Sequence, residues 1–276
     1  MKFFRSRGRN DAGTTAASPL AQAMSLYMNG RYAEAEAEAR AVAEARSALR
    51  LDSHALLALS VAALAMCAQG RHAEALAAYD ELLPVFGRTF GAEHPQTLKL
   101  RSDRAQTLVG IDRYAECEAE CAAVARIADR GAGSLMHYTA GAARNGLIFA
   151  LNKQGRHEEA EALARGTLAA HPAPSRLTLV LQLGLTRALN GQGRHAEALA
   201  EADRAEAVRR KTPEDLSRAE TGAVELAVAT ALLGLGRAAE ARTRTMAAHD
   251  ACRAAFGPDH HRTVEAQALL DRIDGT

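Results

Sequence analysis

The chain has 276 residues, with 34 Lys and Arg against 33 Asp and Glu, which gives a formal net charge of +1. This balance excludes a general electrostatic attraction to nucleic acid, since such attraction needs an excess of positive charge. Aromatic residues make up only 4% and Trp is absent, so the core has to be built from closely packed Ala, Leu and Val. No run of about 18 apolar residues occurs, and the sequence therefore predicts no transmembrane helix.

The first 17 residues read MKFFRSRGRNDAGTTAA and are basic, without the apolar run that a secretory signal needs. We interpret residues 1–17 as a disordered basic tail. The alternative is a segment that touches a membrane or an acidic partner through Phe3, Phe4 and its three arginines. The four cysteines stand at uneven spacing within helical patterns, which is typical of reduced thiols, so we expect a cytoplasmic protein.

A short motif recurs along the rest of the chain. GRYAEA begins at Gly30 and returns as GRHAEA, DRYAEC, GRHEEA, GRHAEA and GRAAEA. These copies begin at Gly70, Asp112, Gly155, Gly193 and Gly236, so the steps are 40, 42, 43, 38 and 43 residues. A period of about 20 to 50 residues indicates a repeat array, in which each unit packs on its neighbours and no single central core exists.

Each copy lies between two segments with helical periodicity. Around Gly70, apolar residues recur at steps of three and four on both sides, from Leu56 to Met66 and from Ala75 to Leu83. The sequence therefore predicts helix-turn-helix pairs followed by a terminal helix that covers the open end of the array. The pairs are expected near residues 18–50, 52–90, 95–130, 135–171, 175–211 and 213–256, and the terminal helix at 261–273.

The first residues of the motif predict the geometry of each turn. Glycine supplies the left-handed backbone that ends a helix, and Asp112 in the third copy reaches it at some cost. The glutamate that follows favours the positive N-terminus of the next helix. Two positions after the turn residue stands a ring that we expect to fill the corner: Tyr32, His72, Tyr114, His157 and His195. Ala238 takes this place in the sixth copy, where we expect a looser corner.

Small residues recur at fixed distances from each turn. Five positions after it stand Ala35, Ala75, Cys117, Ala160, Ala198 and Ala241, and seven positions before it stand Ala23, Ala63, Ala105, Ile148, Thr186 and Ala229. In these residues the chain resembles the tetratricopeptide repeat family, over roughly residues 18–274. The resemblance implies an all-α, right-handed α-solenoid of about six pairs with a C-terminal capping helix. Ile148 departs from the pattern, and we expect it to loosen the fourth pair.

The period exceeds the length of about 34 residues that is usual in this family, by about one turn in each helix. FGAEHPQTL at residues 90–98 and FGPDHHRTV at residues 256–264 mark two of the long junctions. They resemble the GxxHPxT linker of the kinesin-light-chain-like subfamily, which is widespread in bacterial signalling proteins.

No motif for catalysis occurs: GxSxG, HExxH, a Gly-rich phosphate loop and paired CxxC are all missing. We therefore expect no enzyme activity, no catalytic residue, no cofactor and no metal. Cys117 and Cys121 have a spacing that would suit two metal ligands, but other copies have small core residues at these positions, so we interpret both as core. His260 and His261 are interpreted as a solvated helix start.

The candidate binding residues lie on the first helix of each pair. The resemblance implies that these helices line a concave groove, with inner positions three, six, ten and thirteen residues before each turn. The middle of the groove then carries Lys99, Ser102, Gln106, Asn145, Phe149, Asn152, Arg187 and Asn190. An Asn amide can bond both N–H and C=O of an extended peptide, and Lys or Arg can meet a carboxylate. The alternative is that these side chains are merely solvated.

In the first two pairs the inner positions are largely apolar, at Leu20, Met24, Tyr27, Leu57, Leu64 and Cys67. This half of the groove is predicted to take a hydrophobic side chain or to be covered by the N-terminal tail. The sequence as a whole favours a protein-interaction scaffold that binds a peptide or partner segment. The alternatives are a peptide-sensing regulator of a separate transcription factor or enzyme, and an accessory subunit of an enzyme complex.

Overall fold

A computed structural model describes residues 18–47, 52–213 and 218–275. The predicted tail at residues 1–17 lies outside this range. The described chain is helical almost throughout and contains no strand, which confirms the prediction of an all-α protein.

The described helices follow the repeat of the sequence. The pairs are α1 (Pro19–Met28) with α2 (Tyr32–Ser47), α3 (Ser53–Ala68) with α4 (His72–Thr89), α5 (Pro95–Thr107) with α6 (Tyr114–Arg130), α7 (Ser134–Lys153) with α8 (His157–Ala170), α9 (Arg176–Gly191) with α10 (His195–Lys211), and α12 (Ala223–Gly234) with α13 (Ala238–Phe256). The last helix is α14 (His261–Asp274), and two short 3-10 helices are η1 (Leu108–Ile111) and η2 (Arg218–Glu220).

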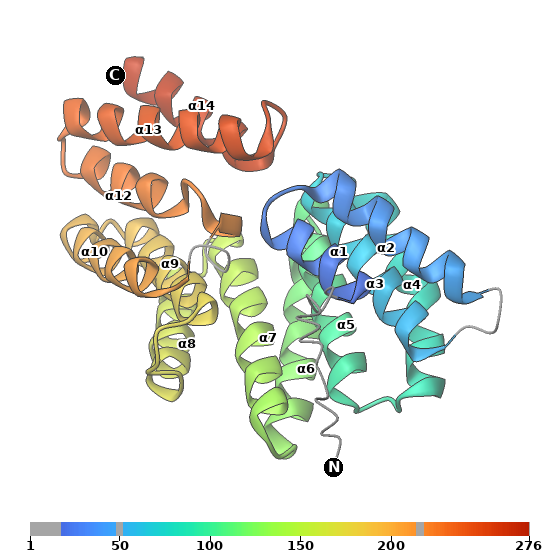
Figure 1. Ribbon diagram of the computed structural model, residues 1–276. Helices are drawn as coiled ribbons and strands as arrows, with labels where there is room; N and C mark the ends of the chain where they lie inside the picture. The colour runs from blue at the N-terminus through green and yellow to red at the C-terminus, as the bar shows by residue number, and fades with distance from the viewer. Residues whose placement is uncertain (1–17, 48–51, 214–217, 276) are drawn as a thin grey trace, which may run out of the picture.

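The pairs stack into a curved array with two layers (Figure 1). Each first helix packs against the first helix of the next pair, from α1 on α3 through to α12 on α14. The second helices pack mainly against first helices, namely that of their own pair and that of the next. The first helices are therefore closer to one another than the second helices are, and they form the inner, concave layer of an α-solenoid.

The turns repeat the same backbone geometry. The five turn glycines have φ between 74° and 79°, and Asp112 reaches the left-handed region with φ 58°. After each turn, the N–H of the motif arginine donates to the carbonyl five residues earlier, as Arg71 does to Met66, which is the Schellman ending of a helix. The same arginine forms a bidentate pair with the glutamate three residues later in all six copies. The arginine and glutamate of the motif thus fix the start of each second helix.

The small residues of the repeat form the seams between helices. Every residue five positions after or seven positions before a turn has 0% exposure. Ile148 was expected to loosen the fourth pair, and this expectation is wrong because Gly184 lies opposite. A Cβ atom at Gly184 would lie 2.8 Å from Cγ2 of Ile148, so the missing methyl group makes room for the larger side chain.

Candidate functional site

Side chains from distant pairs face a common space on the concave side. Burial raises the pKa of the Tyr27 hydroxyl, and the charges of Arg176 and Asp103 act on it in opposite directions. Tyr27, Asp103 and Arg176 belong to α1, α5 and α9. These three residues therefore lie near one another across the array, and we refer to the inner, concave surface of the first helices as the groove.

On α5, the structure leaves little of the predicted polar surface free. Nζ of Lys99 forms an ion pair with Asp103 on the same helix. Ser102 was expected to line the groove, but it is 1% exposed and belongs to the core, so its hydroxyl has no surface to offer a partner. Gln106 donates from Nε2 to Oγ of Ser102 at 3.2 Å. Of the α5 candidates, only Lys99 keeps a charged group at the groove surface.

Asn152 and Asn190 support the turns that follow them. Oδ1 of Asn152 lies 3.1 Å from Nδ1 of His157, and its Nδ2 donates to the carbonyl of Gly184 at 3.0 Å. Oδ1 of Asn190 makes the same 3.1 Å contact with Nδ1 of His195. Both amides are therefore engaged in holding the corner rings. The sequence carried a signal of this role, because Asn three residues before the turn occurs only in copies with His two residues after it.

The corner histidines also account for the presence of glycine at three positions near the end of the first helix of the following pair. Cβ atoms placed on Gly110, Gly191 and Gly234 would lie 2.3–2.5 Å from the rings of His72, His157 and His195 in turn. Each glycine stands two residues before the next turn. After the two tyrosine corners, Tyr32 and Tyr114, this position holds Ala68 and Lys153 instead. The glycine is therefore present wherever the preceding corner is a histidine, because the ring lies directly over its backbone.

One group of predicted residues keeps free polar atoms in the groove. The Cζ atom of Arg187 lies 5.3 Å from the ring centroid of Phe149, and Nζ of Lys153 lies 5.7 Å from it. Asn145 lies one helical turn before Phe149 on α7. In the ranges that the structure describes, Asn145 and Arg187 make no hydrogen bond or ion pair, and both are half-buried. We refer to Asn145, Phe149 and Arg187 as the Arg187 cluster.

A buried carboxylate ties the last helix to the array. Glu220 in η2 is 4% exposed and forms ion pairs with Arg176 at the start of α9 and with Arg262 in α14. Burial alone would raise the pKa of Glu220, but the charges of Arg262 and Arg176 outweigh it and hold the pKa below its usual value. Arg262 also donates to the carbonyl of Ala219. The start of α14 is therefore fixed to η2 and α9.

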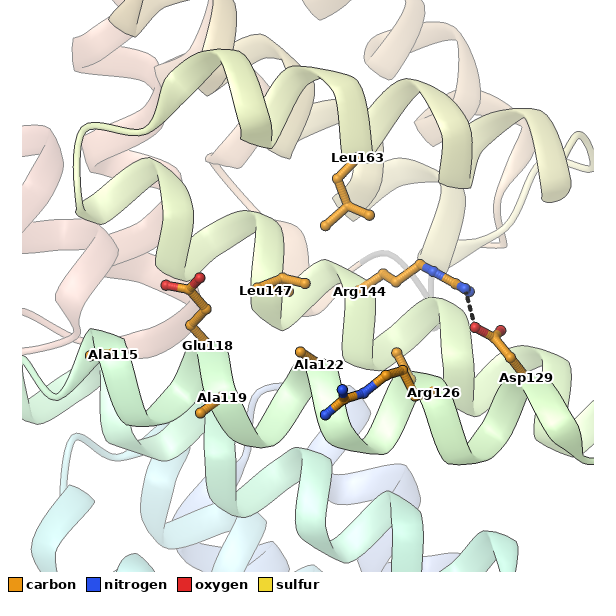
Figure 2. A pocket seen from close by; sticks show the side chains of 10 residues that line it. Ala115, Glu118, Ala119, Ala122, Arg126, Asp129, Arg144, Leu147 and Leu163 are labelled. Carbon is orange, nitrogen blue, oxygen red and sulfur yellow. Dashed lines mark hydrogen bonds and ion pairs between the residues drawn. The ribbon is translucent and has the colours of Figure 1, made fainter.

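A hollow of about 590 Å³ lies away from the groove, between α6, α7 and α8 (Figure 2). Its floor consists of small side chains such as Ala119 and Ala122, with Leu147 and Leu163 above them. Asp129 on its rim pairs with Arg144. Glu118, which also lines the hollow, pairs with Arg156. The hollow is a gap between two second helices whose acidic groups are already paired within the chain.

The cysteines and histidines do not gather into a site for chemistry. Sγ atoms of Cys117 and Cys121 lie 3.9 Å apart, and both residues are 0% exposed in the core. Among the described residues, no three side chains of His, Cys, Asp or Glu lie together as metal ligands would. None of the described helices has the length and hydropathy that a membrane crossing requires.

Fold and repeats together define the class of protein as an α-solenoid of helix-turn-helix pairs, and the family model described as tetratricopeptide repeat matches residues 55–119. The chain is similar in structure to the Rap protein complexed with Competence and Sporulation Factor, with a TM-score of 0.65, 11% identity and coverage of 93% of this chain and 74% of that chain. Bacillus thuringiensis PlcR in complex with the peptide PapR7 and DNA gives a TM-score of 0.59, 12% identity and coverage of 95% and 100%.

A third similar structure holds the TPR-like repeats of a kinesin light chain from Podosopora anserina, with a TM-score of 0.53, 22% identity and coverage of 70% of this chain and 94% of that chain. Among curated protein sequences, none matches the chain. At these identities the three structures establish the fold and leave the function to be inferred from the groove itself.

Proposed function

We propose that this chain is a protein-interaction module that holds an extended segment of a partner protein in its concave groove, without chemistry of its own. The observation that supports the proposal most is the Arg187 cluster. A carboxamide and a guanidinium without partners among the described residues stand on neighbouring first helices, α7 and α9, on the inner layer of the array. Polar groups that are half-buried and unpaired gain the most from a partner.

The chemistry of the cluster favours a segment with a carboxylate. Arg187 and Lys153 both lie against the ring of Phe149, so two positive charges share one aromatic surface. A guanidinium binds a carboxylate through two parallel hydrogen bonds, and the Asn145 amide can bond the main chain of an extended segment beside it. Lys99 adds a third positive charge, weakened by its pair with Asp103. Asn152 and Asn190 serve this surface indirectly, by fixing the turns at the ends of α7 and α9.

Two of the similar structures support this proposal by analogy. One is a complex with Competence and Sporulation Factor and the other a complex with the peptide PapR7 and DNA. Both resemblances extend over more than nine-tenths of this chain. They favour, as a second candidate, a regulator that senses a peptide and acts on a separate transcription factor or enzyme. In either case the groove would take the peptide or partner segment.

The test begins with capture of partners from the native host and their identification by mass spectrometry. Affinity for the captured partner is then compared for the wild type, the double variant Asn145→Ala/Arg187→Ala and the control Arg126→Ala. Arg126 is an exposed arginine of α6 outside the groove. We expect the double variant to weaken binding by about tenfold or more, equivalent to at least about 1.4 kcal/mol, and the control to leave it unchanged. Equal affinities of the wild type and the double variant would refute the proposal.

A further inference from the structure

The two ends of the array meet. The ring of Tyr32, at the start of α2, stacks on Phe256 at 5.9 Å and on His260 at 6.3 Å between centroids. Phe256 ends α13 and His260 precedes α14, so the partners of Tyr32 come from the opposite end of the sequence. Figure 1 shows the turn between α1 and α2, in blue, beside the orange loop between α13 and α14. The array therefore closes on itself at this contact.

The first turn is shaped for this contact. A Cβ atom on Gly30 would lie 3.0 Å from Cε1 of Phe256 and 3.5 Å from the carbonyl oxygen of Ala255. At the corresponding Gly70, Gly155, Gly193 and Gly236, a Cβ atom would meet nothing within 4 Å. All five glycines are needed for their positive φ, but only Gly30 is covered by a distant segment. A side chain at Gly30 would press against the ring of Phe256, so the glycine favours the close approach of the two ends.

The start of α14 lies near the Arg187 cluster. His261 is the first residue of α14, and it is exposed to solvent. It lies within electrostatic range of Arg187, which belongs to the fifth pair. The ring contact with Tyr32 therefore connects the first turn to a segment that lies near the Arg187 cluster.

The contact is held unequally on its two sides. On the C-terminal side, Arg262 fixes α14 through the buried Glu220 and the carbonyl of Ala219. On the N-terminal side the contact consists of stacked rings, and no hydrogen bond or ion pair that Tyr32, Phe256 or His260 makes with a described residue crosses it. Contacts made by a few rings without polar bonds open more readily than a buried ionic network. The weak point lies between Tyr32 and Phe256.

We propose that Tyr32, Phe256 and His260 form an aromatic clasp that closes the concave groove, and that the groove admits a partner segment when the first turn separates from the loop between α13 and α14. This inference rests on the proposed function for the use of the groove. It adds that the aromatic clasp controls the entry of a partner segment into the groove, although its residues are far from the Arg187 cluster in the sequence. The clasp is a binding site for the C-terminal loop on the first repeat.

A native thiol reports on the opening. Cys67 is half-buried on α3, a helix of the inner layer, with Sγ 3.6 Å from Nδ1 of His72. The other three cysteines are 0% exposed. The full-length chain is treated with a maleimide that carries a long polyethylene glycol chain and, separately, with a small thiol reagent. Mass spectrometry identifies the labelled cysteine, so the rate at Cys67 is measured by itself.

The test variant is Phe256→Ala, and the matched control is Phe90→Ala. Phe90 occupies the same place in the other copy of the FGxxH motif, where its ring stacks on His94 at 5.4 Å within its own junction. We expect Phe256→Ala to raise the rate with the bulky maleimide by about fivefold or more, because the open fraction grows when the closed state loses a contact. The rate with the small reagent should change by less than about twofold, and Phe90→Ala should change neither rate. His260→Ala must act in the same direction as Phe256→Ala.

Two outcomes would overturn the clasp. The first is an equal rate with the bulky maleimide in the wild type and in both clasp variants. The second is an equal acceleration by Phe90→Ala, since this would report looser packing of the repeats in general. The measurement needs no partner, so failure of the clasp leaves the proposed function standing, and failure of the Arg187 cluster variants leaves the clasp standing.

Discussion

The variant Gly191→Ala tests the relation between a corner histidine and the glycine of the next helix. The new methyl carbon would lie 2.3–2.4 Å from three atoms of the His157 ring, which is far inside van der Waals contact. The ring cannot easily swing away, because its Nδ1 is held by Asn152 at 3.1 Å. Overpacking of this kind costs about 1–3 kcal/mol, and Ala gains at most about 1 kcal/mol over Gly in a helix. We therefore expect a net loss of about 1–2 kcal/mol in the free energy of unfolding.

A double-mutant cycle isolates the cause. In the background of His157→Ala the ring is gone, so Gly191→Ala should be neutral or should stabilise by up to about 0.5 kcal/mol. Gly166→Ala in α8 is the control, since a Cβ atom there would meet nothing within 4 Å, and it should stabilise by about 0.5–1 kcal/mol in both backgrounds.

The assay is unfolding in urea followed by circular dichroism, with midpoints compared because repeat arrays need not unfold in one step. The reasoning is refuted if Gly191→Ala stabilises the wild type as much as Gly166→Ala does. It is also refuted if the loss caused by Gly191→Ala persists without the ring of His157.

Three further predictions concern the turns, the buried carboxylate and the clasp. Asp112→Gly should raise the free energy of unfolding by about 0.5–1 kcal/mol, and with it the midpoint of urea unfolding, because φ of 58° is strained for Asp and free for Gly. Glu220→Gln should destabilise by about 3–5 kcal/mol, since two arginines lose a buried counter-ion, and calorimetry would show little change if the pair contributed nothing. Burial is the main reason that the pKa of the half-buried His260 falls to about 3 in the closed array, whereas an exposed His has about 6.5. The closed form thus binds fewer protons, so its stability is full above about pH 6.5 and is lost as pH falls toward about 3, and hydrogen exchange of α1 and α14 should rise between pH 7 and 5.

Much of the fold follows from the sequence because each repeat contacts only its neighbours. The motif predicted the left-handed turns, including Asp112, and the small residues that form the seams are all buried. The error at Ile148 came from treating a position by itself, whereas the space it needs is supplied by Gly184 on the next first helix. A repeat pattern shows which positions face inward. Whether a large side chain fits at such a position depends on the size of the residue that faces it from the neighbouring helix.

The groove was harder to predict, because position on a helix does not show whether a polar group is already used. Asn145, Asn152 and Asn190 all have inward positions, yet only Asn145 is unpaired among the described residues. Asn152 and Asn190 lie within the last turn of their helices, where the chain reverses and brings a histidine five residues ahead within bonding distance. The linked occurrence of Asn and His in the fourth and fifth copies was visible in the sequence as the sign of this use.

The two copies of the FGxxH junction show why closure of the array escaped prediction. In the first copy, Phe90 stacks on His94 and packs at a tilt against Phe86, so its ring contacts are local. In the second, Phe256 packs at a tilt against His260 of its own junction but also stacks on Tyr32. The local sequence is the same, and what differs is the surface that the accumulated rotation of the array brings opposite the junction. That rotation is the sum of small angles between pairs, which no single repeat encodes. A ring that packs locally in the middle of the array therefore becomes a contact between its ends when the array has turned far enough to meet its own first corner.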